Sequence, residues 1–334
     1  MTERPLGVAL VTGATGAVGP ALVRALVQRG YGVRVLVRQT PPAGLLLDSV
    51  ELIHGDLDDP QTAPRAVAGV RLIFHLAARL HINEPTPAMT AAYRRTNVDA
   101  TRWLVEAAQA AGVQRLLFCS TISVYGACAA GQILDEQTPV APQSLYAETK
   151  WLAEEVVHGA QNQAGQPLGV VLRLAAVYGP HMRGNYCTLA RALSQRRFFY
   201  VGSGQNRRTL VFDADVARAA ILAAESAVAA GQTYNVSDGQ LYTLQQIVET
   251  ICHVQRRQPP ALHLPQTFMR SMATACQAGA KLVGLRAPFT PALIDKLTED
   301  VAVSSAKLQR QLGFAPSVGL KQGWLATLQS KPNM

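Results

Sequence analysis

The sequence predicts an α/β protein built on a doubly wound parallel sheet, with a smaller, mostly C-terminal α/β lobe. Short, almost wholly apolar runs alternate with longer segments of helical periodicity. Runs without polar alternation are typical of strands that helices cover on both faces, and such sheets bind ligands where their strands end. The expected strands are GVALVTG, GVRVLVR, VELIHGD, VRLIFHLAA, QRLLFCST and GVVLRLAAVYGP, and helices are expected at 20–29 and 96–111.

With 334 residues, the chain is long enough for two packed units. From about Gly179 the alternation gives way to helices, turns and two short strands, RTLVF and TYNVS. Two later helical patterns, which begin at Asp215 and Thr243, are expected to return to the first domain. The expected division is residues 1–178, with returning segments at about 210–226 and 233–254, for the first domain, and residues 179–209 and 255–334 for a substrate lobe.

Basic charge is concentrated in the C-terminal half of the chain. Residues 1–180 carry 14 Lys and Arg against 14 Asp and Glu, whereas residues 181–334 carry 17 against 8. Such an excess favours an anionic partner, such as nucleic acid, a lipid surface or a phosphorylated small molecule, although a merely soluble basic surface would look the same. Of these partners we expect the small molecule and no nucleic acid.

Metal and disulfide chemistry are not expected. The five cysteines are scattered without a C-x-x-C pair, and the seven histidines show no metal-ligand spacing. The uncharged run from Pro5 to Val23 has the length of a membrane span, but its four glycines and two prolines favour a strand, a turn and a helix. We therefore expect a cytoplasmic protein without a targeting segment, a membrane span or a bound metal.

A glycine triplet, Gly13, Gly16 and Gly19, lies between the first expected strand and the first expected helix. Glycine has no Cβ to block an approaching pyrophosphate, and the helix N-terminus offers free N–H groups and the positive end of a dipole. Because a strand precedes the triplet and a helix follows it, the spacing predicts a dinucleotide site rather than a plain tight turn. The expected contacts are Gly13, Thr15, Gly16, Ala17, Val18 and Gly19.

The end of the second expected strand bears on which dinucleotide binds. An acidic residue there accepts a hydrogen bond from the ribose hydroxyl of NAD, but this chain has Val37 followed by Arg38. A guanidinium suits the 2′-phosphate of NADP, so Arg38 favours NADP(H) without excluding NAD(H); alternatively, Arg38 is a solvated residue at a strand end. After the third strand, Asp56 and Leu57 are expected to meet the adenine ring.

A threonine, a tyrosine and a lysine are expected to form the catalytic site. Thr121 ends the fifth expected strand, while Tyr146 and Lys150 lie four residues apart, on one face of the next helix. A cation about 6 Å from the phenol would lower its pKa by roughly two units. Tyr146 could then exchange a proton with an alcohol or ketone while a nicotinamide ring exchanges hydride with the same carbon, and Thr121 would hold the substrate oxygen.

With these motifs the chain resembles the extended short-chain dehydrogenase/reductase family, the NAD-dependent epimerase/dehydratase group. The resemblance covers nearly the whole chain and includes the segments GDLDD, HLAA, NVDATRWLVEAA, YNVSDG and SSAKLQRQLGFAP. It implies a Rossmann-type fold, and it gives the catalytic roles of that family to Thr121, Tyr146 and Lys150. The further cofactor contacts that it implies are Leu76, Ala77, Ala78, Asn97, Tyr146 and Lys150.

More narrowly, HLAARLHI, PHMRGNYCTLARAL and VGSGQNRRTLVFDADVA are similar to nucleotide-sugar C4 epimerases and 4-keto-sugar enzymes of polysaccharide assembly. Arg208 matches the position of an arginine that holds the substrate diphosphate there, and Asn185 lies in a loop that approaches the same phosphates. Two features depart from the pattern: Val37 replaces the acid of strictly NAD-dependent epimerases, and PPALHLPQTFMRS has no clear counterpart of a later arginine. The implied substrate contacts are Arg79, Thr121, Ser123, Tyr146, Asn185 and Arg208.

One amphipathic pattern has no place in this scheme. Its members recur at helical spacing and are Phe268, Met272, Ala275, Ala278, Leu282 and Leu285. A basic amphipathic helix could touch a membrane or a lipid-linked sugar, although a helix that closes over the substrate lobe is the simpler expectation. Glu154 and Glu155, which follow Lys150, are expected to be solvated.

The residues leave three functions open, of which we prefer the first. An epimerase would oxidise C4 of a UDP-hexose to a transient 4-keto sugar and regenerate NAD(P) in each turnover. A reductase would consume NADPH to reduce a 4-keto sugar or a steroid- or flavonoid-type ketone, which Arg38 favours. A catalytically silent module would only bind nucleotide, but an intact Thr121, Tyr146 and Lys150 argue against this. The resemblance also implies a homodimer, formed through helices at 96–111 and 146–159.

Overall fold

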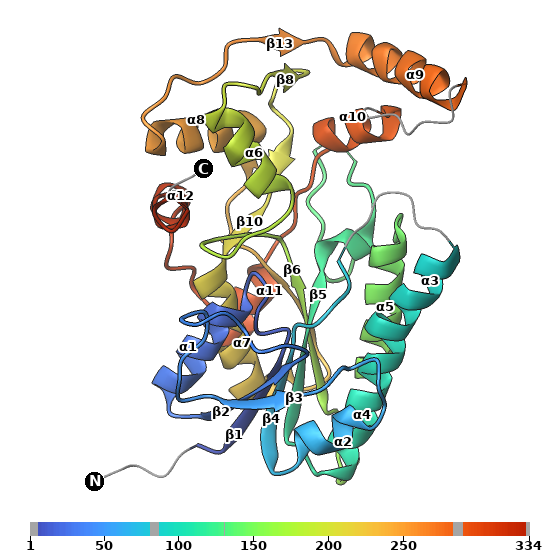
Figure 1. Cartoon of the computed structure of the whole chain (residues 1–334), viewed down its shortest axis with the longest axis vertical. Helices are drawn as coiled ribbons and strands as arrows, with labels where there is room; N and C mark the ends of the chain where they lie inside the picture. The colour runs from blue at the N-terminus through green and yellow to red at the C-terminus, as the bar shows by residue number, and fades with distance from the viewer. Residues whose placement is uncertain (1–5, 81–86, 130, 283–289, 332–334) are drawn as a thin grey trace.

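The computed structural model describes residues 6–80, 87–129, 131–282 and 290–331. Its core is a seven-stranded sheet in the order β11-β6-β5-β4-β1-β2-β3, and every strand runs parallel to its neighbours (Figure 1). The predicted doubly wound α/β class is therefore confirmed. The strands are β1 Val8–Thr12, β2 Gly32–Val37, β3 Glu51–His54, β4 Val70–His75, β5 Arg115–Thr121, β6 Gly169–Leu174 and β11 Thr233–Val236.

Alternate residues of each strand face opposite sides of the sheet, and both sides are apolar. Val11 is buried with one group of helices, whereas its neighbour Leu10 is buried with the other. Helices therefore cover both faces, as almost wholly apolar strands require. One face carries α1 Gly19–Arg29, α7 Asp213–Glu225 and α11 Ala306–Leu312, and the other carries α2 Thr62–Val67, α4 Ala100–Ala110 and α5 Leu145–His158.

The helix expected at 96–111 begins irregularly. α3 Pro87–Arg94 runs directly into a π-helical turn, η1 Arg95–Asp99, which leads into α4. A π turn fits one extra residue into a helical turn, and such turns are frequent at functional sites. This widened turn carries Asn97, whose side chain is buried.

The remaining elements form what we call the second lobe, which continues from the end of β6 (Figure 1). In its core the ring of Tyr178 stacks on Trp324, with centroids 5.3 Å apart, and meets Phe212 edge-on. The segment GVVLRLAAVYGP, expected as one strand, forms two: β6 in the central sheet and β7, which pairs with β10 outside that sheet. The elements are β7 Ala176–Tyr178, α6 Asn185–Ser194, β8 Tyr200–Val201, β9 Arg207–Arg208, β10 Leu210–Phe212, β12 Tyr242–Thr243, α8 Leu244–Val254, β13 His263–Leu264, α9 Gln266–Leu282, α10 Pro291–Thr298 and α12 Leu320–Gln329.

The helix at 244–254 lies elsewhere than expected. Its apolar residues Ile247, Val248 and Ile251 are buried with Trp324 in the second lobe, where α8 packs against α6 and α12. The strand TYNVS, by contrast, is β11 and extends the central sheet beside β6. An amphipathic pattern shows that a helix has a buried face and does not show which neighbour covers it.

The amphipathic pattern that begins at Phe268 is helical, as α9. Leu285, its last member, lies outside the described residues. No helix in the described parts of the chain is both long enough and apolar enough to cross a bilayer.

Candidate active site

The loop between β1 and α1 presses against the loop that follows β4. A Cβ on Gly13 would lie 2.6 Å from the backbone nitrogen of Ala77, and one on Gly19 would overlap the carbonyl group of Ala14. A Cβ on Gly16 would meet only the carbonyl oxygen of Gly13, at 3.1 Å. The glycines at 13 and 19 thus permit close packing, whereas Gly16 lies with Thr15 and Ala17 on the partly exposed side of the loop.

No side chain caps the N-terminus of the helix that follows this loop. α1 has no side-chain cap and no acidic residue in its first turn, and its N-cap position is Val18. Its first N–H groups and the positive end of its dipole can therefore serve an anion. A pyrophosphate fits this arrangement, so the residues present suit the dinucleotide that the spacing predicts.

A buried chain of hydrogen bonds fixes the loop after β4. Thr101 Oγ1 donates its proton to the Asn97 carbonyl at 2.8 Å, so the His75 Nε2 atom, 3.0 Å away, must donate to Thr101. His75 Nδ1 then accepts from Thr12 Oγ1 at 2.7 Å, and Thr12 accepts from the Ala77 N–H at 3.3 Å. Burial, together with nearby Lys150, lowers the pKa of His75 to about 3, so the ring stays neutral.

Asn97 holds the next part of the same loop. Its Oδ1 accepts from the Arg79 N–H at 2.7 Å, and its Nδ2 donates to the Arg79 carbonyl at 3.3 Å and to Thr149 Oγ1 at 3.0 Å. Thr149 lies on α5 between Tyr146 and Lys150. Asn97, expected as a cofactor contact, therefore ties the loop of Leu76, Ala77 and Ala78 to the helix that carries the catalytic candidates.

α5 presents Tyr146 and Lys150 to the end of β5. Cys119 lies close enough to both side chains to influence the pKa of each. Lys150 is buried, and its Nζ lies 3.7 Å from the centre of the Phe118 ring. The amino group of Lys150, which the sequence spacing places near the Tyr146 phenol, therefore faces β5 and not solvent.

Thr121 ends β5 at the same edge of the sheet. Its Oγ1 donates to Ser123 Oγ at 3.1 Å and accepts from the Ser123 N–H at 3.2 Å. The structure thus places Thr121 and Ser123 at the end of β5 and Tyr146 and Lys150 on the helix that packs beside it.

In the protein alone, Tyr146 is not the acidified phenol that its spacing from Lys150 predicts. Burial raises the pKa of Tyr146 to about 12, and Cys119 and Tyr93 add to the rise, although the side chain is partly exposed. Burial also lowers the pKa of Lys150 to about 7, which Cys119 and Glu154 oppose. The loss of hydration penalises both charged forms and is the largest cause of both pKa shifts.

Glu154, expected to be solvated, is fully buried. Arg173 of β6 donates to its carboxylate from Nη2 at 2.6 Å and from Nε at 3.0 Å, and Ser120 donates to it as well. Ser120 precedes Thr121, and Glu154 lies one helical turn after Lys150. These hydrogen bonds join the end of β5 to α5. In the sequence, the only sign of them is that Glu154 lies on the same helical face as Lys150.

The residues expected near the adenosine lie at the ends of β2 and β3. Arg38 directly follows β2 and is exposed, and the neighbouring Val37 carbonyl accepts from the Gly55 N–H at 3.0 Å. Asp56 Oδ1 accepts from the Asp58 N–H at 3.0 Å, and Leu57 is partly buried against the helical layer. This placement fits both a phosphate contact and a solvated role for Arg38.

The expected phosphate ligands of the substrate lie in the second lobe. Arg208 Nη2 donates to the carbonyls of Lys296 and Leu297, each at 3.0 Å, near the end of α10. Arg208 also lies near Tyr186, where its charge opposes the burial that raises the Tyr186 pKa to about 12. Asn185, the other expected ligand, begins α6 directly before Tyr186.

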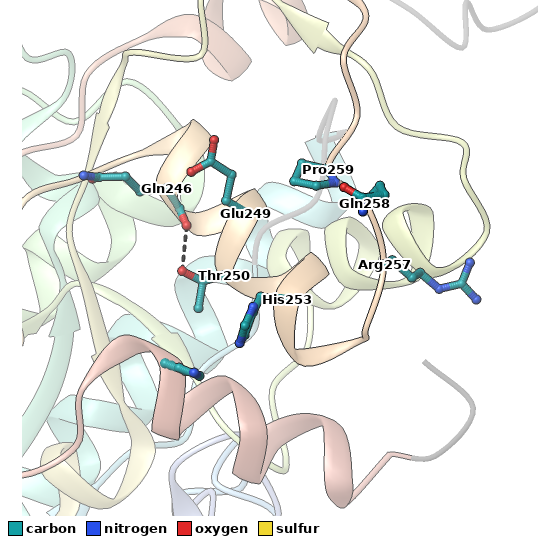
Figure 2. A pocket seen from close by; sticks show the side chains of 8 residues that line it. Gln246, Glu249, Thr250, His253, Arg257, Gln258 and Pro259 are labelled. Carbon is teal, nitrogen blue, oxygen red and sulfur yellow. Dashed lines mark hydrogen bonds between the residues drawn. The ribbon is translucent and has the colours of Figure 1, made fainter.

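A hollow of about 640 Å³ lies in the second lobe and away from these residues (Figure 2). Figure 2 shows its side chains spread along α8 and the turn that follows it, and Lys321 of α12 completes the lining. None of the expected site residues lines this hollow. Its lining residues are Gln246, Glu249, Thr250, His253, Arg257, Gln258, Pro259 and Lys321.

Comparisons with known proteins agree with this geometry. Residues 9–237 match the model of the NAD dependent epimerase/dehydratase family. The 2-alkyl-3-oxoalkanoate reductase of Stenotrophomonas maltophilia (strain K279a) is 32% identical over 332 residues, which cover 94% of this chain and 96% of that protein. The N-acetyl-alpha-D-glucosaminyl-diphospho-ditrans,octacis-undecaprenol 4-epimerase of Escherichia coli O157:H7 is 25% identical over 321 residues, or 96% of this chain and 94% of that protein. The solved structure of MoeE5 in complex with UDP-glucose and NAD is 26% identical, with a TM-score of 0.76 over 98% of this chain and 99% of that one.

Proposed function

Because the chain belongs to the NAD dependent epimerase/dehydratase family, whose enzymes use NAD or NADP, we propose that it is a nucleotide-sugar epimerase acting at C4 of a UDP-hexose through a transient 4-keto sugar. One observation carries the proposal: Tyr146 and Lys150 face the end of β5 beside Thr121, across from a glycine loop that suits a pyrophosphate. Hydroxyl, phenol and ammonium groups in this order can move a proton to and from the hydroxyl oxygen on a sugar carbon.

A nicotinamide dinucleotide bound at the glycine loop would supply a ring that accepts hydride and returns it. The remaining tasks fall to side chains of this protein. Thr121 and Ser123 would hold the C4 oxygen, and Tyr146 would take the hydroxyl proton and later return it. Lys150 would stabilise the phenolate once the site is filled and water is excluded, because attraction between the two groups strengthens as water leaves.

The second lobe supports a substrate that carries a diphosphate. Residues 179–212 contain six arginines and neither Asp nor Glu, and Arg208 and Asn185 come from this segment. Guanidinium groups bind phosphate oxygens through paired, charge-assisted hydrogen bonds. The complex of MoeE5 with UDP-glucose and the 4-epimerase of Escherichia coli support the same substrate class and the same carbon.

A second function is favoured by two observations. Arg38 stands where an acid would select NAD, and the chain is 32% identical to a 2-alkyl-3-oxoalkanoate reductase. Both agree with an NADPH-dependent reductase of a 4-keto sugar or of a steroid- or flavonoid-like ketone. This enzyme would use the same residues and consume its cofactor.

One assay separates the two functions. UDP-glucose, UDP-N-acetylglucosamine and a 4-keto sugar are supplied separately, with NAD or NADPH, while product stereochemistry and cofactor absorbance are followed together. Interconversion of C4 epimers without net change in absorbance supports the epimerase. Loss of one NADPH for each ketone reduced overturns it in favour of the reductase, and dinucleotide binding without any turnover overturns both.

We further propose that the protein acts in the cytoplasm, in polysaccharide biosynthesis, as a homodimer formed through α4 and α5. The helices α4 and α5 lie together on one face of the sheet, as a shared four-helix interface would require. Light scattering on the purified protein tests the dimer, and a monomeric mass at all concentrations would contradict it.

A further inference from the structure

α9 packs on the second lobe by one narrow face and turns large apolar side chains outward. Met269 and Ala273 are buried against Val201 and Ile294. Phe268 and Met272, one position earlier in each turn, share a face of the helix and are 53% and 51% exposed. Leu262, in the segment that leads into α9, is 57% exposed. The packing of the second lobe therefore does not explain why these large apolar side chains are exposed.

Two helices of the same lobe end in an identical and unusual way. α6 and α8 are each followed by the residues Gln-Arg-Arg, and the first arginine of each pair, Arg196 and Arg256, has a φ of 56°. They are the non-glycine residues with positive φ in the described part of the chain, at a position where glycine is usual. The N–H groups of Arg197 and Arg257 close both turns onto the carbonyls of Ala192 and Cys252.

These two turns and α9 belong to one end of the molecule. Gln255 Nε2 donates to the Ala190 carbonyl at 3.1 Å, so the end of α8 lies against α6. The turn after α6 leads into β8, which pairs with β13, and β13 leads into α9. In Figure 1, β8, β13 and α9 form the end opposite the N-terminus. We give the name distal surface to seven exposed residues of this end, four of them basic and three apolar: Arg196, Arg197, Arg256, Arg257, Leu262, Phe268 and Met272.

Two segments of this end are rich in arginine and contain no acidic residue. Residues 179–212 and 250–280 contain nine arginines and no Asp or Glu, although the exposed Glu249, directly before the second segment, lines the same hollow as Arg257. Arg270 forms an exposed ion pair with Asp295 at 3.2 Å, which leaves the paired arginines of the two turns as the main charge of this end. A cation at a helix C-terminus interacts favourably with the negative end of the helix dipole, and one arginine is enough for that. The dipole therefore does not explain why each turn has an arginine with positive φ and a second arginine directly after it.

We propose that the distal surface docks the protein on an anionic phospholipid membrane. The four arginines would meet lipid phosphates, and Phe268, Met272 and Leu262 would enter the boundary between headgroups and acyl chains. A nucleic acid would match the arginines and leave these apolar side chains in water. The proposal does not depend on which reaction the site performs, and it would set the substrate lobe against the membrane.

Vesicle sedimentation tests the proposal on the full chain loaded with its dinucleotide. Wild-type protein should sediment with phosphatidylcholine vesicles that contain phosphatidylglycerol, less with phosphatidylcholine alone, and less as salt rises. Arg197→Gln with Arg257→Gln should weaken binding to the anionic vesicles roughly 10- to 30-fold, since each arginine near the surface contributes about 1 kcal/mol. Phe268→Ser with Met272→Ser should reduce binding about as much.

Matched controls come from exposed residues of the sheet domain. Arg65→Gln with Arg310→Gln removes the same charge, and Leu47→Ser with Val228→Ser removes similar apolar side chains; both should bind like the wild type. Equal losses in the controls, or wild-type protein that ignores anionic vesicles, would overturn the proposal. So would release by inorganic phosphate at matched ionic strength, or a change from dimer to monomer in the Phe268 and Met272 variant, which would assign the apolar face to a second copy of the chain.

Discussion

Glu154 and Arg173 form an ion pair inside the core, with the carboxylate fully buried, the arginine 5% exposed, and 2.6 Å between Arg173 Nη2 and Glu154 Oε2. Removing one partner leaves the other charged and without compensation, so Glu154→Gln should lower the free energy of unfolding by about 3–5 kcal/mol. Glu154→Leu combined with Arg173→Met should cost much less, because no buried charge remains. Urea unfolding measures both.

The exposed pair of Arg94 and Glu148, 2.8 Å apart, provides the control for that prediction. Because water and salt screen this pair, Glu148→Gln should change stability by about 1 kcal/mol or less. Similar losses from Glu154→Gln and Glu148→Gln would contradict the importance of burial for the internal pair.

Tyr146→Phe should separate binding from chemistry. The variant keeps the aromatic ring and loses the proton donor, so dinucleotide affinity should stay near that of the wild type while turnover falls by about 10²- to 10⁴-fold. Tyr31→Phe removes a hydroxyl that binds Glu225 at 3.0 Å, far from β5 along the chain, and should leave turnover unchanged. Full activity of Tyr146→Phe would remove this residue from the mechanism.

Lys150 should make stability depend on pH. Burial lowers its pKa to about 7 in the native state, against 10.5 for an ordinary lysine, so between these pH values the unfolded chain binds more protons. The free energy of unfolding should therefore rise with pH in this window, by up to about 1.4 kcal/mol per pH unit from this residue.

Lys150→Met removes that contribution, so the difference in stability between wild type and variant should change steadily from pH 7 to 10.5. Lys321→Met, at an exposed position, should give a constant difference. A constant difference for Lys150→Met as well would show that the native protein keeps this lysine charged.

Arg38→Ala should weaken NADP more than NAD. Loss of one charge-assisted hydrogen bond to the 2′-phosphate corresponds to about 10- to 100-fold in affinity, and NAD lacks that phosphate. Calorimetric titration of both dinucleotides against the variant and against Arg102→Ala measures the effect. Equal changes for NADP and NAD would leave Arg38 as a solvated residue at a strand end.

Local spacing was enough to predict much of the fold and part of the site. Gly13, Gly16 and Gly19 follow from what a strand, a tight turn and a helix need in sequence, and Tyr146 and Lys150 share a face because helices repeat every 3.6 residues. The glycines follow β1, and Tyr146 and Lys150 lie on α5; their roles in binding and catalysis stay predictions.

The missed features depend on neighbours that are distant in sequence. His75 meets Thr12 and Thr101 across two strands and a helix, and Arg173 reaches Glu154 only because β6 lies beside β5 and α5 covers both. The raised pKa of Tyr146 has the same origin, since loss of hydration is a property of the surrounding atoms and not of the motif.

The π-helical turn at Arg95–Asp99 has a consequence for how this chain can vary. A residue taken out of an α-helix rotates everything after it by roughly 100°, but this turn already holds one residue more than an α turn. A single deletion here would let the turn relax to α geometry with the apolar side of α4 still on the sheet, while the Asn97 amide would lose its place beside Arg79 and Thr149. Homologous sequences with a one-residue gap at these five positions should therefore also lack the asparagine.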